Sequence, residues 1–310
     1  MIVKFNNKTC THIAWAGGKG ASLARLMQSG FPVPPGFVVG AAAFEIFLQE
    51  NELGADIEVI LKRVKHEDIN LVDRASREIC ALIEEVIVSA ELEKEILEHF
   101  RKLKTKFVAV RSSATAEDSK TASWAGELET YLNVTRGNII ESVKKCWVSL
   151  FTPRAIFYRF EKGLYQEKIS VAVVVQKMIA SEVSGVCFTV HPVTRDKGQM
   201  VIEACFGLGE ALVSGQITPD TYVIHKKDLS ILDVNVSEQE FAMVRGAQGN
   251  VKKKLSLSEG RQQKLNGTQI QELVALCAQI EKHYRHPQDI EWAFAYGRPY
   301  ILQSRPITTL

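Results

Sequence analysis

The stretch WAGGKGAS at positions 15–22 places one lysine, Lys19, among three glycines. The apolar residues that follow recur at helical spacing up to position 29, so the glycine-rich stretch is predicted to open a helix. Free backbone N–H groups and the positive end of the helix dipole attract anions at such a start, which indicates a phosphate contact. A flexible helix entry without a ligand is the alternative. The stretch is not a P-loop, because Ile13 and Gly20 stand where that motif requires a glycine and a serine or threonine.

Arg111 is a second candidate phosphate ligand. It follows the short β-branched stretch 107–110 and precedes a loop rich in serine, threonine and alanine. Loops at strand ends often carry ligand-binding groups, and a guanidinium can bind a phosphate through two parallel hydrogen bonds. The residues alone equally allow Arg111 to pair with Glu117 or Asp118 in a surface loop.

Four polar residues near the C-terminus, Asp289, Glu291, Gln303 and Arg305, alternate with apolar residues in DIEWAF and YILQSRPI. On two strands this alternation would place all four on one face of a sheet, with YGRP as the turn between the strands. Two carboxylates and an amide oxygen facing a cleft form an oxygen-rich site of the kind that Mg²⁺ shares with phosphate oxygens. A hairpin with a solvated outer face would have the same pattern.

A second glycine-rich approach to a helix occurs in EACFGLGEALVSGQITPD at positions 203–220. Glu203 is predicted to end a strand, and Gly207 and Gly209 lead to Glu210. Backbone donors in such a loop can approach an anion, while Glu210 can hold a metal ion. Taken alone, the stretch does not decide between a binding loop and an ordinary one.

The predicted secondary structure changes near the middle of the chain. The 310 residues, 46% of them hydrophobic, can supply one large core or two of ordinary size. Residues 41–104 read as mostly helical, whereas strands separated by turns dominate from Ile169 onward, with one helix near 268–284. We therefore expect a helix-rich first half and a sheet-rich second half, changing near Gln176, with a nucleotide in the cleft between two lobes.

Charge and cysteine content restrict the partners and the compartment. With 38 basic and 36 acidic residues the net charge is +2, which gives no overall attraction to nucleic acid or membrane. The six cysteines include no C-x-x-C pair, no apolar run reaches the ~18 residues that span a bilayer, and the N-terminus lacks a signal-peptide pattern. We expect a cytoplasmic protein. None of the seven histidines has metal-ligand spacing, so all of them, His191 included, are expected to be structural or exposed.

Taken together, these stretches resemble the N-terminal nucleotide-binding half of the family that contains phosphoenolpyruvate synthase, pyruvate phosphate dikinase and the rifampin phosphotransferases, and resemble phosphoenolpyruvate synthase most. The matching phrases follow the family's order and cover essentially the whole chain. They are GGKGASLARL with GFPVPPGFVV, AVRSSATAED with ASWAGELETYLNV, SLFTPRAIFYR, VVVQKMIASEVSGVCFTV, GLGEALVSGQITPD, and QDIEWAF with YILQSRPIT.

The resemblance implies an ATP-grasp fold of the α+β class, in which lobes of residues 1–177 and 178–310 hold ATP in a cleft between them. It implies that Lys19 and Arg111 bind the polyphosphate and act in catalysis with Arg305. It also implies two further sets of contacts, one from the segment that joins the lobes, whose backbone would recognise adenine, and one around Mg²⁺ and the phosphates. These sets are Gln176, Lys177, Met178 and Ile179 for adenine, and Glu210, Glu291, Gln303 and Arg305 for the metal and phosphates, with Glu210, Glu291 and Gln303 as the metal ligands.

The implied reaction transfers the β,γ-phosphates of ATP to a histidine on a swivelling domain and releases AMP, in the synthesis of phosphoenolpyruvate from pyruvate. The likeness ends at QSRPIT, and no histidine lies in the Gly/Ser/Thr-rich setting of the family's phospho-acceptor. We therefore expect a dikinase-type enzyme component that needs a phosphohistidine domain, either on a separate subunit or in a longer parent chain. Two alternatives stay open: the ATP-binding part of a rifampin-type small-molecule phosphotransferase, and a non-catalytic ATP-sensing module.

Overall fold

The chain forms two compact units, each with its own sheet and helices. Unit 1 consists of Met1–Gln28 and Pro35–Met178, and unit 2 of Ser29–Pro34 and Ile179–Leu310. The computed structural model describes residues 1–64, 67–115, 129–164, 169–246 and 249–308.

The short segment Ser29–Pro34 belongs to unit 2 although it lies early in the sequence. The Ile301 amide donates to the Pro32 carbonyl at 3.0 Å, and the rings of Phe31 and His283 meet edge-on with centroids 5.8 Å apart. Each unit is a group of residues that contact one another in space much more than they contact the other group, and this grouping does not test the lobes of an ATP-grasp fold. The division into ATP-grasp lobes at residues 1–177 and 178–310 therefore stays a prediction.

Unit 1 contains a five-stranded sheet in the order β1-β2-β5-β3-β4, with every neighbouring pair antiparallel. The central strand β5 has the sequence VAVVVQK, and its continuous β-branched run is the pattern of a strand covered on both faces. The strands are β1 (Ile2–Lys4), β2 (Gly36–Val39), β3 (Val108–Ala114), β4 (Thr130–Val134) and β5 (Val171–Lys177).

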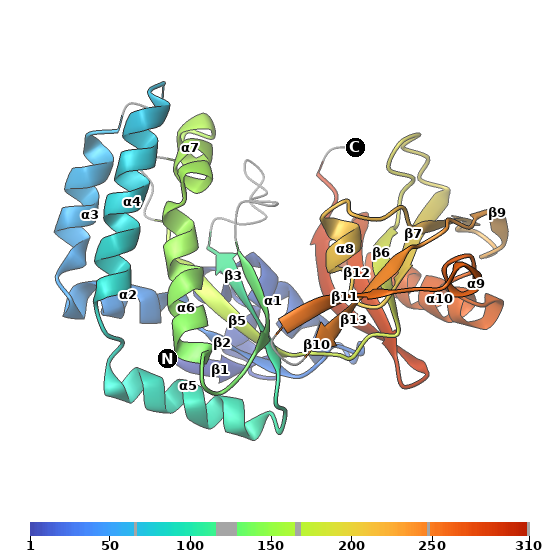
Figure 1. Ribbon diagram of the computed structural model, residues 1–310, viewed down its shortest axis with the longest axis horizontal. Helices are drawn as coiled ribbons and strands as arrows, with labels where there is room; N and C mark the ends of the chain where they lie inside the picture. The colour runs from blue at the N-terminus through green and yellow to red at the C-terminus, as the bar shows by residue number, and fades with distance from the viewer. Residues whose placement is uncertain (65–66, 116–128, 165–168, 247–248, 309–310) are drawn as a thin grey trace. The chain divides into compact units, whose positions relative to one another are not determined.

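Seven α-helices among the described residues of unit 1 surround this sheet, and α3, α4 and α6 lie side by side (Figure 1). Their apolar residues recur on one side of each helix, as the mixed charged and apolar sequence of this half predicts. The helices are α1 (Ile13–Gln28), α2 (Ala41–Glu50), α3 (Leu53–Lys62), α4 (Ile69–Glu85), α5 (Ala90–Lys102), α6 (Ile139–Val148) and α7 (Pro153–Glu161), with 3-10 turns η1 (Lys8–Thr11) and η2 (Ser149–Phe151).

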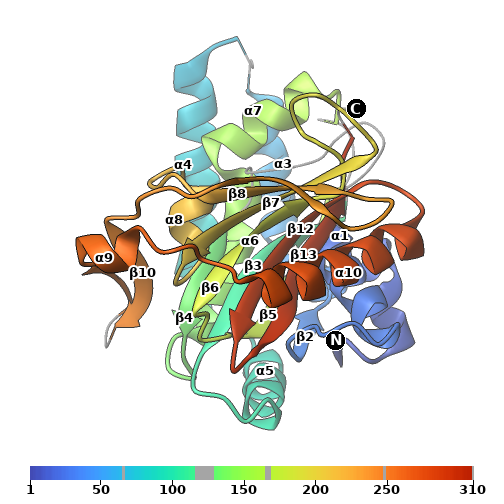
Figure 2. The ribbon, with the colours of Figure 1, turned by 90° about the vertical axis from the view of Figure 1, so that its right-hand side faces the viewer.

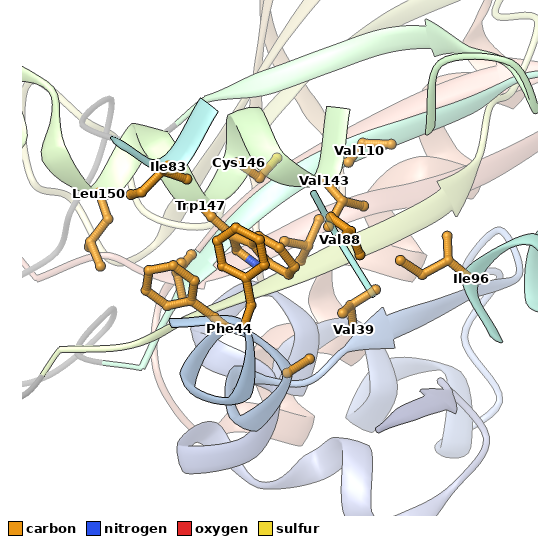
Figure 3. Close-up of a cluster of buried hydrophobic side chains, with 14 of the residues drawn as sticks. Val39, Phe44, Ile83, Val88, Ile96, Val110, Val143, Cys146, Trp147 and Leu150 are labelled. Carbon is orange, nitrogen blue, oxygen red and sulfur yellow. The ribbon is translucent and has the colours of Figure 1, made fainter. Parts of the chain in front are cut away.

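The main core of unit 1 lies between the sheet and the helices α2 to α7. Figure 3 shows Val39 of β2 and Val110 of β3 in the same cluster as Phe44 of α2 and Trp147 of α6. The Trp147 ring lies 5.7 Å from the Phe44 ring and 4.8 Å from the Phe47 ring, measured between centroids. Aromatic side chains of this size supply much of the burial that stabilises a core.

The two faces of the unit 1 sheet carry different side chains. Alternate residues of β5 from Val171 to Val175 belong to the main core, so Val174 and Gln176 point to the opposite side. Helix α1 covers that opposite side, since a Cβ added to Gly20 would lie 3.4 Å from Cγ2 of Val174. We call this the α1 side of the sheet.

Unit 2 contains a six-stranded antiparallel sheet in the order β13-β12-β6-β7-β8-β9 and a separate hairpin of β10 and β11. Tyr296 and Gly297, with φ of 54° and 73°, form the tight turn between β12 and β13 that YGRP predicts. The strands are β6 (Val183–Phe188), β7 (Gln199–Phe206), β8 (Asp220–His225), β9 (Ile231–Asn235), β10 (Phe241–Gly246), β11 (Gly249–Lys254), β12 (Gln288–Ala295) and β13 (Arg298–Pro306).

Helix α10 packs on one face of this sheet next to β12 (Figure 2), and its range confirms the helix predicted near 268–284. None of the helices in the described parts of the chain has an apolar stretch long enough to cross a membrane. The helices of unit 2 are α8 (Glu210–Val213), α9 (Leu257–Gly260) and α10 (Gly267–Tyr284).

Candidate nucleotide site

Lys19 stands just after a break in helix α1. Gly17 has φ 68° and ψ 177°, so the regular helix continues only from Gly18 onward. A left-handed φ with this ψ is accessible mainly to glycine, and a Cβ at Gly17 would lie 2.2 Å from the Ser113 carbonyl oxygen. The prediction that the glycine-rich stretch opens a helix is confirmed, and Lys19 is half-buried in its first turn.

Arg111 lies on β3 and shares the α1 side of the sheet with Ser113, two residues further along. Ser113 contacts α1 directly, because its hydroxyl donates to the Ala16 carbonyl at 2.9 Å. The two predicted polyphosphate cations, Lys19 and Arg111, therefore come from elements that touch on one side of one sheet. The alternative partners of Arg111 named above, at positions 117 and 118, lie outside the described residues.

Gln176 is the next polar residue on this α1 side. Its register places it opposite Ala109, two residues from Arg111 along β3. The side chain is 3% exposed, and its Nε2 has no hydrogen-bond partner among the described residues. A buried amide donor without a partner costs about 1–3 kcal/mol. A ligand that accepts a hydrogen bond from Gln176 would remove this cost.

After Gln176 the chain leaves the sheet, and some of its main-chain hydrogen-bonding groups have partners there while others do not. The Lys177 amide donates to the Pro35 carbonyl at 2.9 Å, and the Met178 amide donates to the Phe107 carbonyl at 3.2 Å. In an antiparallel ladder residue 35 would return a bond to the Lys177 carbonyl, but proline has no N–H. The Lys177 carbonyl therefore lacks that ladder bond, and Ile179 begins the second segment of unit 2.

The hairpin of β12 and β13 brings four predicted residues of unit 2 together. Glu291 lies opposite Gln303, and Asp289 lies opposite Arg305. Asp289 and Glu291 are two residues apart on β12, and Gln303 and Arg305 are two residues apart on β13. All four side chains therefore share one face, as the alternation in the sequence predicts. A β-bulge follows Glu291, and such bulges often lie next to functional sites.

Arg305 is held by Asp289. The Arg305 Nε and Nη2 atoms lie 2.8 Å and 2.7 Å from the same Asp289 oxygen, Oδ2. Burial raises the pKa of Asp289, and the charge of Arg305 and its hydrogen bond oppose that rise. The ion pair fixes the direction of the Arg305 guanidinium, which is the group that the sequence assigns to phosphate binding.

Gln303 and Glu291 fit a magnesium ion that also binds phosphate. Gln303 is 6% exposed, and its Oε1 accepts no hydrogen bond from any described residue. One carboxylate with one amide oxygen suits Mg²⁺, which keeps several waters and takes phosphate oxygens as further ligands. The described residues contain no group of three His, Cys, Asp or Glu side chains that would bind a metal by itself.

Glu210 belongs to a different element from these metal candidates. It is exposed at the start of the short helix α8, and its carboxylate accepts a hydrogen bond from Nδ2 of Asn250 in β11. The loop before Glu210 is held against the hairpin of β10 and β11, because the Leu208 amide donates to the Met243 carbonyl at 2.8 Å. A role for Glu210 in metal binding stays a prediction.

Glu203 lies inside β7, so the expectation that it ends a strand was wrong. The strand continues because the apolar residues after Glu203 are buried in the sheet. Glu203 lies opposite Val186, which lies opposite Glu291, so Glu203 shares the face of the metal candidates. Burial raises the pKa of Glu203, and the nearby charge of Asp289 raises it further.

Replacing Glu203 with glutamine should stabilise the fold near neutral pH. A carboxyl whose folded pKa is raised contributes stability below its ordinary value of 4.5, and this contribution is lost as the pH rises through the folded pKa. Glu203→Gln removes that loss, so we expect a Tm about 2 °C above the wild type at pH 7 and no difference at pH 4. Thermal unfolding at both pH values measures this. Glu238→Gln, which changes an exposed carboxylate, is the control, and an equal Tm difference at both pH values would contradict the prediction.

These side chains are of the types expected in a nucleotide-binding domain of the ATP-grasp type. One unit presents a lysine in the first turn of a helix beside an arginine on a strand, and the other presents a carboxylate, an amide and an arginine on one sheet face. Residues 13–310 match the family described as "Pyruvate phosphate dikinase, AMP/ATP-binding domain", and the chain belongs to this family.

Curated relatives of the chain are phosphoenolpyruvate synthases and a rifampicin phosphotransferase. The "Probable phosphoenolpyruvate synthase" of Archaeoglobus fulgidus is 49% identical over 304 residues, which cover 96% of this chain and 40% of that protein. The "Phosphoenolpyruvate synthase" of Pyrococcus furiosus is 36% identical over 354 residues, covering 99% of this chain and 43% of that protein. The "Rifampicin phosphotransferase" of Bacillus subtilis is 37% identical over 304 residues, covering 97% of this chain and 35% of that protein. The chain thus spans 35–43% of the length of these three relatives.

Proposed function

We propose that this chain binds ATP with Mg²⁺ and transfers the β,γ-phosphates to a histidine on another domain, with release of AMP. The reaction would serve the synthesis of phosphoenolpyruvate from pyruvate in the cytoplasm. The observation that carries this proposal is the match of residues 13–310 to an AMP/ATP-binding domain shared with phosphoenolpyruvate synthases.

Unit 1 would hold the polyphosphate and the base. Lys19 and Arg111 supply positive charge on the α1 side of the sheet, and a guanidinium can bind two phosphate oxygens at once. The unpartnered Nε2 of Gln176 suits a ring nitrogen of adenine, and the Lys177 carbonyl suits its exocyclic amine. This agrees with the expectation that the segment from Gln176 to Ile179 recognises adenine, and adds a side chain to it.

Unit 2 would hold the metal and complete the neutralisation of charge. Glu291 and Gln303 are the proposed metal ligands best supported by their geometry, because they lie opposite each other on neighbouring strands and the Gln303 Oε1 accepts no hydrogen bond from any described residue. Bound Mg²⁺ would offset negative charge on the β- and γ-phosphates. Arg305, held by Asp289, would contribute a fixed guanidinium to the same phosphates.

In the transfer itself a histidine ring nitrogen would attack the β-phosphorus of ATP. A bond forms between that nitrogen and the β-phosphorus, the bond from the β-phosphorus to the bridging oxygen of the α-phosphate breaks, and AMP leaves with this oxygen. Little covalent chemistry falls to the chain, so positioning and charge stabilisation are its contribution.

The acceptor histidine would be supplied by a further domain, since the relatives are much longer than the matched region. The likeness to the Bacillus subtilis protein supports a second candidate function, in which the chain is the ATP-binding part of a rifampin-type phosphotransferase. A nucleotide sensor without catalysis is the non-enzymatic alternative.

The decisive experiment mixes the chain with ATP, Mg²⁺ and a purified phosphohistidine domain of the phosphoenolpyruvate synthase type. AMP formation that is lost when the acceptor histidine of that domain is replaced by alanine supports the proposal. A phosphohistidine domain of the rifampin phosphotransferase type is tested in parallel, and faster AMP formation with it favours the rifampin-type function. Calorimetry that detects ATP binding without AMP formation in either mixture favours the sensor.

Replacing Gln176 with methionine should stabilise the unliganded protein and weaken ATP binding. Methionine fills a similar volume and removes the buried donor that has no partner, so we expect the Tm to rise by about 2 °C. Without that donor the Kd for MgATP should increase about tenfold. Thermal unfolding and calorimetry measure the two effects, with the exposed Gln216→Met as the matched control. Unchanged ATP affinity would remove the Gln176 side chain from the site.

A further inference from the structure

A single serine joins the two segments that carry the candidate polyphosphate cations. The Ser113 hydroxyl accepts a hydrogen bond from the Gly20 amide at 3.2 Å and donates one to the Ala16 carbonyl at 2.9 Å. These two partners flank Lys19, and they lie 93 and 97 residues before Ser113 in the sequence. The hydroxyl therefore spans the break in α1 from one side to the other.

The main chain at this break leaves no space between α1 and β3. A Cβ at Gly17 would lie 2.2 Å from both the carbonyl oxygen and the hydroxyl oxygen of Ser113. Ser113 itself is 0% exposed. A contact this close, with both bonds of the hydroxyl made to main-chain atoms, sets the position of the helix start against the strand.

The same strand carries Arg111 two residues earlier, on the same face as Ser113. The hydroxyl therefore connects the main chain around Lys19 to the strand that presents Arg111. Two cations act together on one polyphosphate only if their spacing matches it, and in catalysis a misplacement of about 1 Å can lower the reaction rate by about 10²-fold.

We propose that Ser113 is a positioning residue that fixes the spacing between Lys19 and Arg111, without touching the nucleotide. This inference rests on the proposed ATP binding and adds to it a residue with a specific task. Serine is suited to the position because one small hydroxyl donates and accepts at the same time. Alanine would leave both the Gly20 amide and the Ala16 carbonyl without this partner.

The test compares binding of MgATP and of AMP to the wild type and to Ser113→Ala by calorimetry and by ligand-induced shifts in Tm. AMP is the control ligand because it lacks the β- and γ-phosphates. We expect Ser113→Ala to weaken MgATP binding by about 10- to 100-fold, as for the loss of one hydrogen bond to a charged phosphate, while AMP binding changes by less than about twofold. Ser112→Ala is the matched control, since this neighbouring buried serine donates to the Glu129 carbonyl instead, and it should leave the affinity for both ligands unchanged.

Two other outcomes would contradict either the role of Ser113 or the proposed function. If Ser113→Ala binds MgATP as the wild type does, or loses MgATP and AMP equally, Ser113 has no positioning role. If the wild type binds no MgATP, the proposed function itself fails, and the two failures are thereby distinguished. Ser113→Cys keeps a γ atom, although a larger one, with a weaker donor and acceptor, and it replaces the alanine variant if that variant does not fold. It should show the same selective loss of MgATP affinity.

Discussion

Replacing Arg111 with alanine is expected to reduce AMP formation at least ~10³-fold in the mixture with a family histidine domain. The guanidinium is proposed to stabilise charge that collects on the transferred phosphates, and removal of such a group commonly costs this much in rate. The fold should survive, because Arg111 lies on the α1 side of the sheet, away from the main core of unit 1. AMP release in single-turnover experiments measures the rate, and circular dichroism checks the fold.

The control for this prediction is Arg74→Ala, which removes an exposed arginine of α4 paired with Glu78 at 2.7 Å. Its AMP formation should equal that of the wild type. Full activity of Arg111→Ala would remove Arg111 from the site. Loss of activity together with loss of the circular dichroism signal would assign Arg111 to the fold instead.

Local patterns in the sequence were sufficient to predict the hairpin of β12 and β13 in unit 2. Alternation with period 2 and the YGRP turn fix which residues of β12 and β13 share a face, and both signals lie within twenty residues of each other. The apolar spacing after Lys19 likewise predicted the helix start. Such features depend on neighbouring residues, so they can be read without knowing what packs against them.

The sheet of unit 1 was harder to predict. Its strands β1 and β2 have three and four residues, too few to show alternation, and β2 follows a proline-rich stretch that signals a turn. The assignment of Ser29–Pro34 to unit 2 depends on contacts with Ile301 and His283, more than 250 residues away in sequence. The strands β9, β10 and β11 were not predicted either. All of β9 and most of β11 are exposed, so no alternation between a buried and an exposed face marks them, and β10 is short with only Ala242 and Met243 buried.

The candidate site shows the same division between local and distant information. The types of residue at Lys19, Arg111 and Glu291 indicate their chemistry. The bond between Ser113 and the helix start carries no local signal, because a serine in a polar stretch is common and its partners lie over 90 residues away. Glu203 was predicted to end a strand before the glycine-rich loop, but the strand continues through Phe206.

A second large effect is expected in unit 2, where a fully buried ion pair links β8 to the segment before α10. Asp220 Oδ1 lies 2.9 Å from Lys264 Nζ, and both side chains are 0% exposed. The second carboxylate oxygen accepts from the Tyr222 hydroxyl at 2.9 Å and from the Lys264 amide at 2.8 Å. The Lys264 ammonium also lies 5.3 Å from the ring centroid of Phe206, the last residue of β7 before the loop to Glu210. The network therefore supports the end of the strand from which the glycine-rich loop departs.

Asp220→Ala should destabilise unit 2 by about 3–5 kcal/mol, because it leaves the Lys264 charge buried without its partner. For a unit of this size the loss corresponds to a fall of roughly 10 °C in Tm, measured by thermal unfolding. Glu238→Ala is the matched control. Its carboxylate pairs with Arg261 at 2.8 Å, but the two side chains are 40% and 67% exposed, so a change of about 0–1 kcal/mol is expected. If both variants lose the same small stability, water must reach the Asp220–Lys264 pair, and the buried pair would not be what holds the glycine-rich loop in place.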